Sequence, residues 1–267
     1  MSNNEYLQDI KEYYQHLDLE EHDGIIFPLN KDWKNIAVSV SGGADSALLC
    51  YLLSKIIHDK GLDICIHLIT NVRMYTTRPW QKYDSLRVYH YLKNCFPTIQ
   101  YYRHENYIAP ELETGNIGQI IPHKGQLKGG DQISTFSYAM YICRTHYIDS
   151  WFAGKTLNPD KNFSGAPADR DFYYNGDFSE ILHPYKGLYV CHPFLFKDKS
   201  WIMKQYKNLN VLTLLAETRS CEGDNNSAPE IFENLDFETY VPYQLVPKCK
   251  KCFWCLERQW GLDANNI

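Results

Sequence analysis

The stretch IAVSVSGGADS, at residues 36–46, decides the fold of this 267-residue chain. The apolar run at 36–40 predicts a strand, and the apolar periodicity at 47–57 predicts a helix. Two adjacent glycines predict a tight turn between them, because glycine adopts positive φ and lets the backbone approach a ligand. The turn brings backbone N–H groups, the hydroxyls of Ser41 and Ser46 and the positive end of a helix dipole to one point. Such a point binds phosphate.

This glycine turn differs from the two better-known phosphate loops. It lacks the Lys-Ser/Thr pair of the Walker loop and the G-x-G-x-x-G pattern. A plain Gly-Gly turn between a buried strand and a helix is the alternative interpretation. The hexapeptide at 41–46 resembles the PP-loop of the ATP pyrophosphatase superfamily, whose enzymes split ATP between its α and β phosphates and transfer AMP to a substrate oxygen. The resemblance implies ATP binding by Ser39, Ser41, Gly42, Gly43, Ala44, Asp45 and Ser46.

Composition limits the classes of function. The chain is 44% hydrophobic and 22% charged, which is ordinary for a globular protein. Its net charge of −5 argues against a broad non-specific nucleic-acid surface and favours small-molecule chemistry. No apolar run approaches the ~20 residues that span a bilayer. The first 23 residues are polar and acidic, unlike a signal peptide, so we expect a cytoplasmic protein without a membrane partner.

Strand and helix patterns alternate along the chain, which predicts a doubly wound α/β domain with a parallel sheet. In such a sheet the ligand lies beyond the carboxyl ends of the strands, where the strand order reverses. The PP-loop resemblance implies the five-stranded sheet of the adenine nucleotide alpha hydrolase-like fold. We expect a helical extension at 1–30, with a helix over 5–22, an ATP-binding domain at 31–217 and a zinc-binding tail at 218–267. Expected strands lie at 35–40, 63–70, 98–103 and 150–154, and expected helices at 44–59, 80–95, 131–146, 198–208 and 209–217.

Four of the nine cysteines converge near the carboxyl end. Cys249, Cys252 and Cys255 form C-x-x-C-x-x-C, and Cys221 lies 28 residues upstream. Four thiolates with no free position are typical of structural zinc. An iron–sulfur cluster and unligated thiols are the alternatives. Disulfides are unfavourable in a reducing cytosol.

Three further stretches resemble the 7-cyano-7-deazaguanine synthase (QueC-like) family of PP-loop enzymes. Residues 162–170 (NFSGAPADR) are similar to its substrate loop, residues 193–199 (PFLFKDK) to its Pro-Leu…Lys segment, and 218–223 with 249–256 to its zinc tail. The resemblance implies that ATP, Mg²⁺ and ammonia convert 7-carboxy-7-deazaguanine to the amide and then to the nitrile. Adenylation gives the carboxylate a good leaving group, so the protein need only position reactants and neutralise charge.

The resemblance also assigns roles. Asp45, Ser46 and Lys199 are expected to be catalytic, with Lys199 neutralising phosphate charge. Asp169 is expected to accept from a guanine-like amino group, and Arg170 to meet a carboxylate or phosphate; a surface ion pair is the alternative. Lys155 follows a predicted strand and is either a phosphate or substrate contact or a solvated loop lysine. The expected substrate-binding residues are Lys128, Gly129, Ser164, Gly165, Asp169 and Arg170.

The sequence departs from that family at several positions. Lys128-Gly129-Gly130-Asp131-Gln132 stands where the family has Val-Pro-Gly-Arg-Asn, and Ala166 and Ala168 stand where it has Tyr and Cys. Inserted segments at 105–127 and 224–248 have no obvious counterpart. These departures leave open an enzyme that stops at the amide or joins the activated carboxylate to another amine, such as one on a protein. A silent nucleotide-binding module, a homodimer and a protein partner bound through the insertions also stay open.

Overall fold

The computed structural model describes residues 17–72, 80–108, 120–123, 126–157, 182–185, 187–221 and 248–267. A central sheet has the strand order β5-β4-β3-β8-β10-β9. In that order the strands are Tyr101–Tyr107, Cys65–Val72, Asn35–Ser39, Ser150–Ala153, Leu188–Cys191 and Leu182–Tyr185. The first five run parallel, and β9 pairs antiparallel with β10. The mostly parallel sheet agrees with the expected α/β class; among the described residues it has six strands, so the expected number of five is not confirmed.

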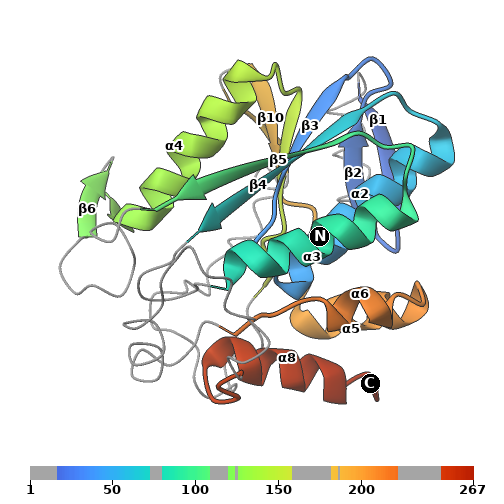
Figure 1. The fold of residues 1–267 in the computed structure, drawn as a ribbon, viewed down its shortest axis with the longest axis vertical. Helices are drawn as coiled ribbons and strands as arrows, with labels where there is room; N and C mark the ends of the chain where they lie inside the picture. The colour runs from blue at the N-terminus through green and yellow to red at the C-terminus, as the bar shows by residue number, and fades with distance from the viewer. Residues whose placement is uncertain are drawn as a thin grey trace, which may run out of the picture.

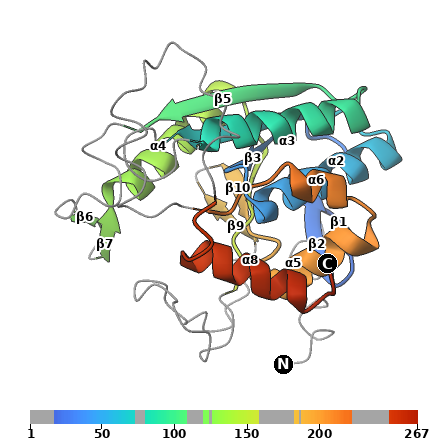
Figure 2. The ribbon, with the colours of Figure 1, turned by 60° about the horizontal axis from the view of Figure 1, so that its bottom comes forward.

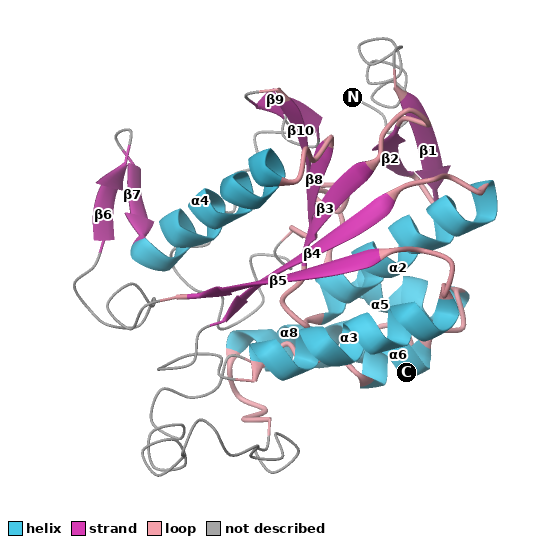
Figure 3. Ribbon diagram, turned by 45° about the horizontal axis from the view of Figure 1, so that its top comes forward, coloured by secondary structure: helices cyan, strands magenta, loops and turns pink. Residues whose placement is uncertain are grey.

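Helices cover both faces of this sheet (Figure 1, Figure 3). One face carries α4, Gly130–Thr145. The opposite face carries α2 (Ala44–Lys60), α3 (Gln81–Cys95), α5 (Lys199–Asn208), α6 (Leu212–Ala216) and α8 (Phe253–Asp263). Helix α8 is the outermost of these and lies along α5 (Figure 2). The C-terminal helix therefore reaches the central α/β domain through α5.

Two apolar cores follow from the alternation of side chains along the strands. Ile36 and Val38 belong to the larger core, under α2, α3, α5 and α6. Ala37, which lies between them, belongs to the smaller core with Met140 and Ile142 of α4. Burial on both faces explains why β3 is an almost continuous apolar run.

The amino-terminal region differs from the helix expected over 5–22. Residues 18–22 form strand β1 (Asp18–His22), which pairs antiparallel with β2 (Ile25–Leu29). Asp23 and Gly24 connect the strands with φ values of 47° and 73°. An Asp-Gly pair suits such a two-residue hairpin turn, because both central residues need positive φ. The expected helix is therefore wrong over 18–22, where the chain forms a hairpin; residues 1–16 lie outside the described part.

A second hairpin stands near the start of α4. Its strands are β6 (Ile120–His123) and β7 (Gln126–Gly129), and they pair antiparallel. Part of the insertion expected at 105–127 therefore forms this hairpin and the end of β5, the edge strand of the parallel set. Within the described ranges, no helix has both the length and the apolar character that a membrane crossing requires.

Candidate nucleotide site and metal centre

The glycine turn at residues 41–46 connects β3 to α2 as the sequence predicts. Gly42 has φ +75°, and a Cβ atom there would lie 2.3 Å from the Cβ of Asp84 in α3. The turn thus requires glycine both for its backbone conformation and for the close approach of α3. Gly154, just after the end of β8, also lies close to the turn, since its Cβ would lie 3.1 Å from the carbonyl carbon of Asp45. Neighbouring elements therefore hold the turn on both sides.

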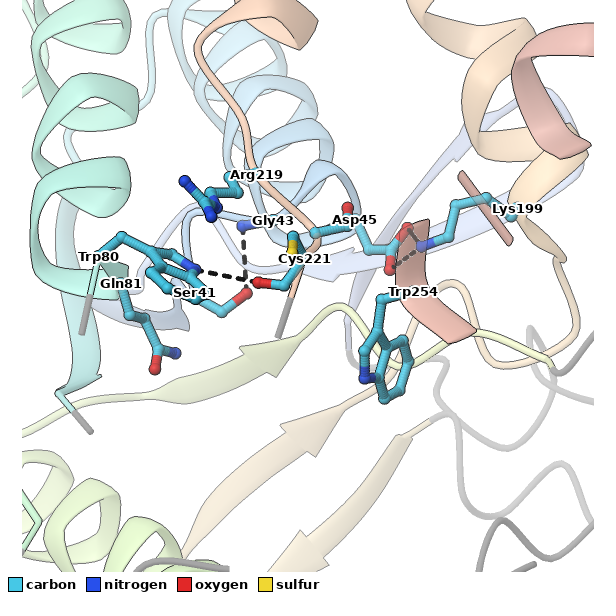
Figure 4. A pocket seen from close by; sticks show the side chains of 10 residues that line it. Ser41, Gly43, Asp45, Trp80, Gln81, Lys199, Arg219, Cys221 and Trp254 are labelled. Carbon is cyan, nitrogen blue, oxygen red and sulfur yellow. Dashed lines mark hydrogen bonds and ion pairs between the residues drawn. The ribbon is translucent and has the colours of Figure 1, made fainter. Parts of the chain in front are cut away.

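The two serine hydroxyls meet inside the turn. Their Oγ atoms lie 3.2 Å apart, and the Ser41 N–H donates to Ser46 Oγ at 3.2 Å. The Gly43 N–H contacts Ser41 Oγ at 3.3 Å (Figure 4). The N-cap residue of α2 is Gly43, which has no side chain with which to cap the helix. Because the first N–H groups of a helix lack intrahelical partners, this end of a 17-residue helix attracts an anion.

Asp45 and Lys199 are 154 residues apart in sequence and in direct contact in the fold. The Lys199 Nζ donates to Asp45 Oδ1 at 2.6 Å and to Oδ2 at 2.5 Å. Glu257 of α8 adds a second carboxylate, 3.5 Å from the same Nζ. The side chains of Lys199 and Glu257 are 2% and 1% exposed, so the cation is enclosed between two acids. Figure 4 shows Asp45 and Lys199 pointing toward one another at one side of the cavity.

Arg219 and Trp80 belong to the site although sequence reasoning did not single them out. The Arg219 backbone N–H donates to the Gly42 carbonyl at 2.9 Å. Its guanidinium carbon lies 3.9 Å from the centre of the Trp80 ring, a cation–π contact. Trp80 Nε1 in turn donates to the Cys221 carbonyl at 3.0 Å. Only the position of Arg219, two residues before a predicted metal ligand, could have pointed to it.

Two cavities open at the turn. The first, of about 270 Å³, lies between the turn and the cysteine cluster, and its lining includes Arg219 and Cys221 (Figure 4). The second, of about 240 Å³, lies at the carboxyl ends of β3, β4 and β8 and is lined by Asn71 and Lys155 among others. Both are lined by Ser41, Asp45 and Gln81. The turn thus stands between two spaces at the point where the strand order reverses, which is where ligands of such sheets bind.

Tyr206 of α5 fixes the first residue of α2. Its hydroxyl donates to the Ala44 carbonyl at 2.7 Å inside the larger core. Burial raises the pKa of Tyr206 well above its usual value. The hydroxyl therefore stays protonated and keeps donating, which helps to hold the start of α2 in place.

The four predicted metal ligands come together in the fold. The sulfur atoms of Cys221, Cys249, Cys252 and Cys255 all lie within 4.8 Å of one another. Cys221 Sγ is 3.5 Å from Cys249 Sγ, which is 4.0 Å from Cys255 Sγ. The Cys252 N–H points to Cys249 Sγ at 3.3 Å, as in a metal knuckle. This group can bind a metal ion, and Cys221 connects it to the wall of the first cavity.

The side chains of the predicted substrate residues lie outside the part of the chain that the structure describes. Lys128 and Gly129 lie in β7, whose side chains are not described. Ser164, Gly165, Asp169 and Arg170 lie outside the described residues. Their expected roles therefore stay predictions. Ser39 is on β3, where its Oγ accepts from Trp151 Nε1 at 2.9 Å, and it lines the second cavity.

Comparisons with known proteins give little beyond this geometry. No protein-family model matches the chain. No curated protein matches it in sequence. Among solved structures, it is similar to the U34-tRNA thiolase NcsA from Methanococcus maripaludis with its [4Fe-4S] cluster, at 13% identity and a TM-score of 0.43. The match covers 98% of this chain and 90% of that one. No conclusion about activity follows from a likeness of this size.

Proposed function

We propose that this protein binds ATP at the 41–46 turn and transfers AMP to an oxygen of its substrate, releasing pyrophosphate. The observation that carries the proposal is the convergence of two serine hydroxyls and an uncapped helix N-terminus at a turn between two cavities. That convergence suits the pyrophosphate part of a nucleotide. The cavity at the strand ends suits the nucleoside, and the cavity at Arg219 suits the acceptor.

Charged groups around the turn support phosphoryl chemistry. Lys199 is fixed beside Asp45, and Arg219 is fixed on Trp80 by its ring contact. Arg219 is pre-organised to neutralise phosphate charge with little reorganisation at the moment of reaction, whereas Lys199, whose charge Asp45 and Glu257 already compensate, holds Asp45 in position. Asp45 and the serine hydroxyls offer the oxygen ligands that Mg²⁺ takes, and bound Mg²⁺ would neutralise further phosphate charge.

The proposed acceptor is the carboxylate of 7-carboxy-7-deazaguanine, as the sequence resemblance implies. Its carboxylate attacks the α-phosphorus, pyrophosphate leaves, and ammonia then displaces AMP to give the amide. A second adenylation, on the amide oxygen, allows loss of AMP and a proton to give the nitrile. Arg219 is a candidate partner for the incoming carboxylate because it lines the acceptor cavity.

The metal proposed for the cysteine centre is zinc. Zn–S bonds of about 2.3 Å in a tetrahedron put the sulfur atoms about 3.8 Å apart. The observed separations of 3.5 and 4.0 Å support a single ion. A four-iron cluster binds each cysteine through a different iron atom and needs wider spacing. Zinc held by four thiolates would fix the wall of the acceptor cavity without taking part in the chemistry.

The proposal is tested by incubating the protein with ATP, Mg²⁺, ammonium and 7-carboxy-7-deazaguanine. Pyrophosphate release should depend on the acid, and it should fall about 100-fold or more in Ser46→Ala, which loses a phosphate donor. Ser54→Ala is the matched control, since it removes a buried hydroxyl from the same helix away from the turn. Equal pyrophosphate release by wild type and Ser46→Ala would refute the proposed role of the turn.

Mass spectrometry of the product separates the variants of this reaction. A nitrile supports the full sequence of two adenylations. An amide or a conjugate with another amine supports a diverged enzyme, which the departures at 128–132, Ala166 and Ala168 motivate. ATP binding without turnover on any carboxylated deazapurine would support a silent nucleotide-binding module instead.

A further inference from the structure

Three histidines meet on the α4 side of the sheet, away from the sites described above. His67 is on β4, His104 is on β5, and His146 follows directly after α4. His67 pairs in register with Tyr102, so His104, two residues further along β5, lies on the same face. His67 also pairs with Ala37 of β3, which belongs to the core under α4. His146, directly after α4, completes the group from the helix that covers this face of the sheet.

Distances within the group suit a metal ion. His67 Nδ1 lies 2.9 Å from His104 Nε2, and one ring nitrogen of each histidine lies within 4.8 Å of the others. Zinc–nitrogen bonds of about 2.0–2.1 Å in a tetrahedron put the ligand nitrogens about 3.4 Å apart. The observed separations are compatible with that value. Small rotations of the half-buried rings of His104 and His146 would bring all three nitrogens to one ion.

A neighbouring amide orients the central ligand. His67 is 3% exposed, and its Nε2 contacts Asn35 Oδ1 at 3.2 Å. An amide oxygen only accepts, so Nε2 carries the proton and Nδ1 presents its lone pair to the other histidines. Metal-binding histidines typically donate their second ring N–H in this way. The Asn35 backbone N–H donates to Asp149 Oδ2 at 3.1 Å, which helps to hold that strand end.

We propose that His67, His104 and His146 bind a divalent transition-metal ion, with zinc as the best fit, at a second metal centre. Three imidazole ligands favour zinc, copper or nickel over magnesium or calcium, which prefer oxygen. The ion would tie the end of α4 to β4 and β5. It would lie toward the beginning of the strands, whereas the nucleotide cavities open at their ends. A fourth ligand position stays available to water or a small anion.

Cobalt titration of the metal-free protein tests this site without nucleotide. Two equivalents of Co²⁺ should bind. One gives the thiolate-to-cobalt charge-transfer band of the cysteine centre, and the other gives only weak visible bands of nitrogen and oxygen ligation. In His104→Asn and in His146→Asn, the second Co²⁺ should bind at least tenfold more weakly, and the thiolate-to-cobalt charge-transfer band should be unchanged. In Asn35→Ala, binding of the second Co²⁺ should weaken about 10–100-fold, because His67 loses the contact that orients its ring.

His90→Asn is the matched control, because His90 is exposed on α3 and lies outside the group. It should bind both equivalents as wild type does. Saturating Zn²⁺ should also raise the melting temperature of wild type more than that of His146→Asn, whose change lies at the partly exposed end of α4. The proposal is overturned if wild type binds no cobalt beyond the thiolate-ligated equivalent, or if both ligand variants bind the second equivalent as tightly as wild type.

Discussion

At the scale of single residues, the candidate nucleotide site depends on glycines, which have no side chain, as much as on its charged residues. Gly42 and Gly154 let α3 and β8 approach the turn to distances that a Cβ atom would crowd. Lys199 contributes through its side chain, because its buried ammonium is needed to compensate the carboxylates of Asp45 and Glu257. Removing Lys199 would leave two carboxylates without their cation, one of them fully buried, which is strongly destabilising.

Gly42→Ala should disable the turn. The substitution strains a residue at φ +75° and forces its Cβ to 2.3 Å from that of Asp84. Left-handed φ alone costs a non-glycine residue roughly 1–2 kcal/mol. The clash with α3 adds to this, so we expect a loss of more than about 3 kcal/mol in unfolding free energy, and loss of ATP binding. Urea unfolding and calorimetry with ATP measure the two effects.

Gly187→Ala is the control for this prediction. Gly187 has φ +89°, and among the described residues no atom beyond the glycine and its chain neighbours lies within 4 Å of the place that an alanine Cβ would take. It should cost only the strain of the backbone, about 1–2 kcal/mol, and leave the proposed ATP binding at the wild-type level. Similar losses of stability for the two variants would show that the approach of α3 does not constrain the turn.

At the scale of elements, the C-terminal helix is fastened to the central domain by one side chain in particular. Arg258 of α8 donates to the carbonyl oxygens of Thr218 and Leu215 at 3.2 and 2.8 Å, and to Thr218 Oγ1 at 2.8 Å. These acceptors lie at and just after the end of α6, where helix carbonyls lack partners and a cation is favourable. The same segment continues to Arg219 and Cys221.

Arg258→Ala should loosen α8 and the cysteine centre together. Hydrogen bonds to a charged group contribute about 1.5–3 kcal/mol, so we expect a loss of about 2–4 kcal/mol in unfolding free energy and faster release of metal to a chromogenic chelator. Lys207→Ala is the control, because its exposed amine donates to the Asn265 carbonyl near the chain end, away from the cysteines. If Arg258→Ala releases metal at the wild-type rate, the docking of α8 does not stabilise the metal centre.

At the scale of the whole molecule, the turn, α3 and the cysteine centre form one connected structure. Arg219 binds the Gly42 carbonyl through its backbone and stacks on Trp80, and Trp80 donates to the Cys221 carbonyl. A change at the cysteine cluster therefore has a short path to the glycine turn at 41–46. This connection is the physical basis for expecting metal loss to affect nucleotide binding.

Cys252→Ser should lower both metal content and ATP affinity. With one thiolate removed, the centre no longer holds Cys221 against α8, and we expect roughly tenfold weaker ATP binding by calorimetry, in the range of ordinary coupling energies. Cys95→Ser is the control, since Cys95 is exposed at the end of α3 and outside the cluster. If metal content falls while ATP affinity stays at the wild-type value, the two sites are independent.

Some elements can be predicted from the sequence, and others escape it for identifiable reasons. The strand–turn–helix at 35–60 is predictable because glycine, burial and periodicity all act locally there. The Asp23-Gly24 hairpin carries a local turn signal, but the helical spacing just upstream obscures it. The antiparallel edge strand β9 escapes prediction because a four-residue strand has almost no pattern of its own.

The sequence alone determined the glycine turn, the alternation of strands and helices and the thiol set of the cysteine centre, because each depends mainly on residue types and local spacing. Only the tertiary structure placed Lys199 beside Asp45, Arg219 on Trp80 and Cys221 at the cavity wall, and only it brought His67, His104 and His146 together. These contacts join segments tens to more than a hundred residues apart. They arise from strand order and helix packing, which no local spacing of residues encodes.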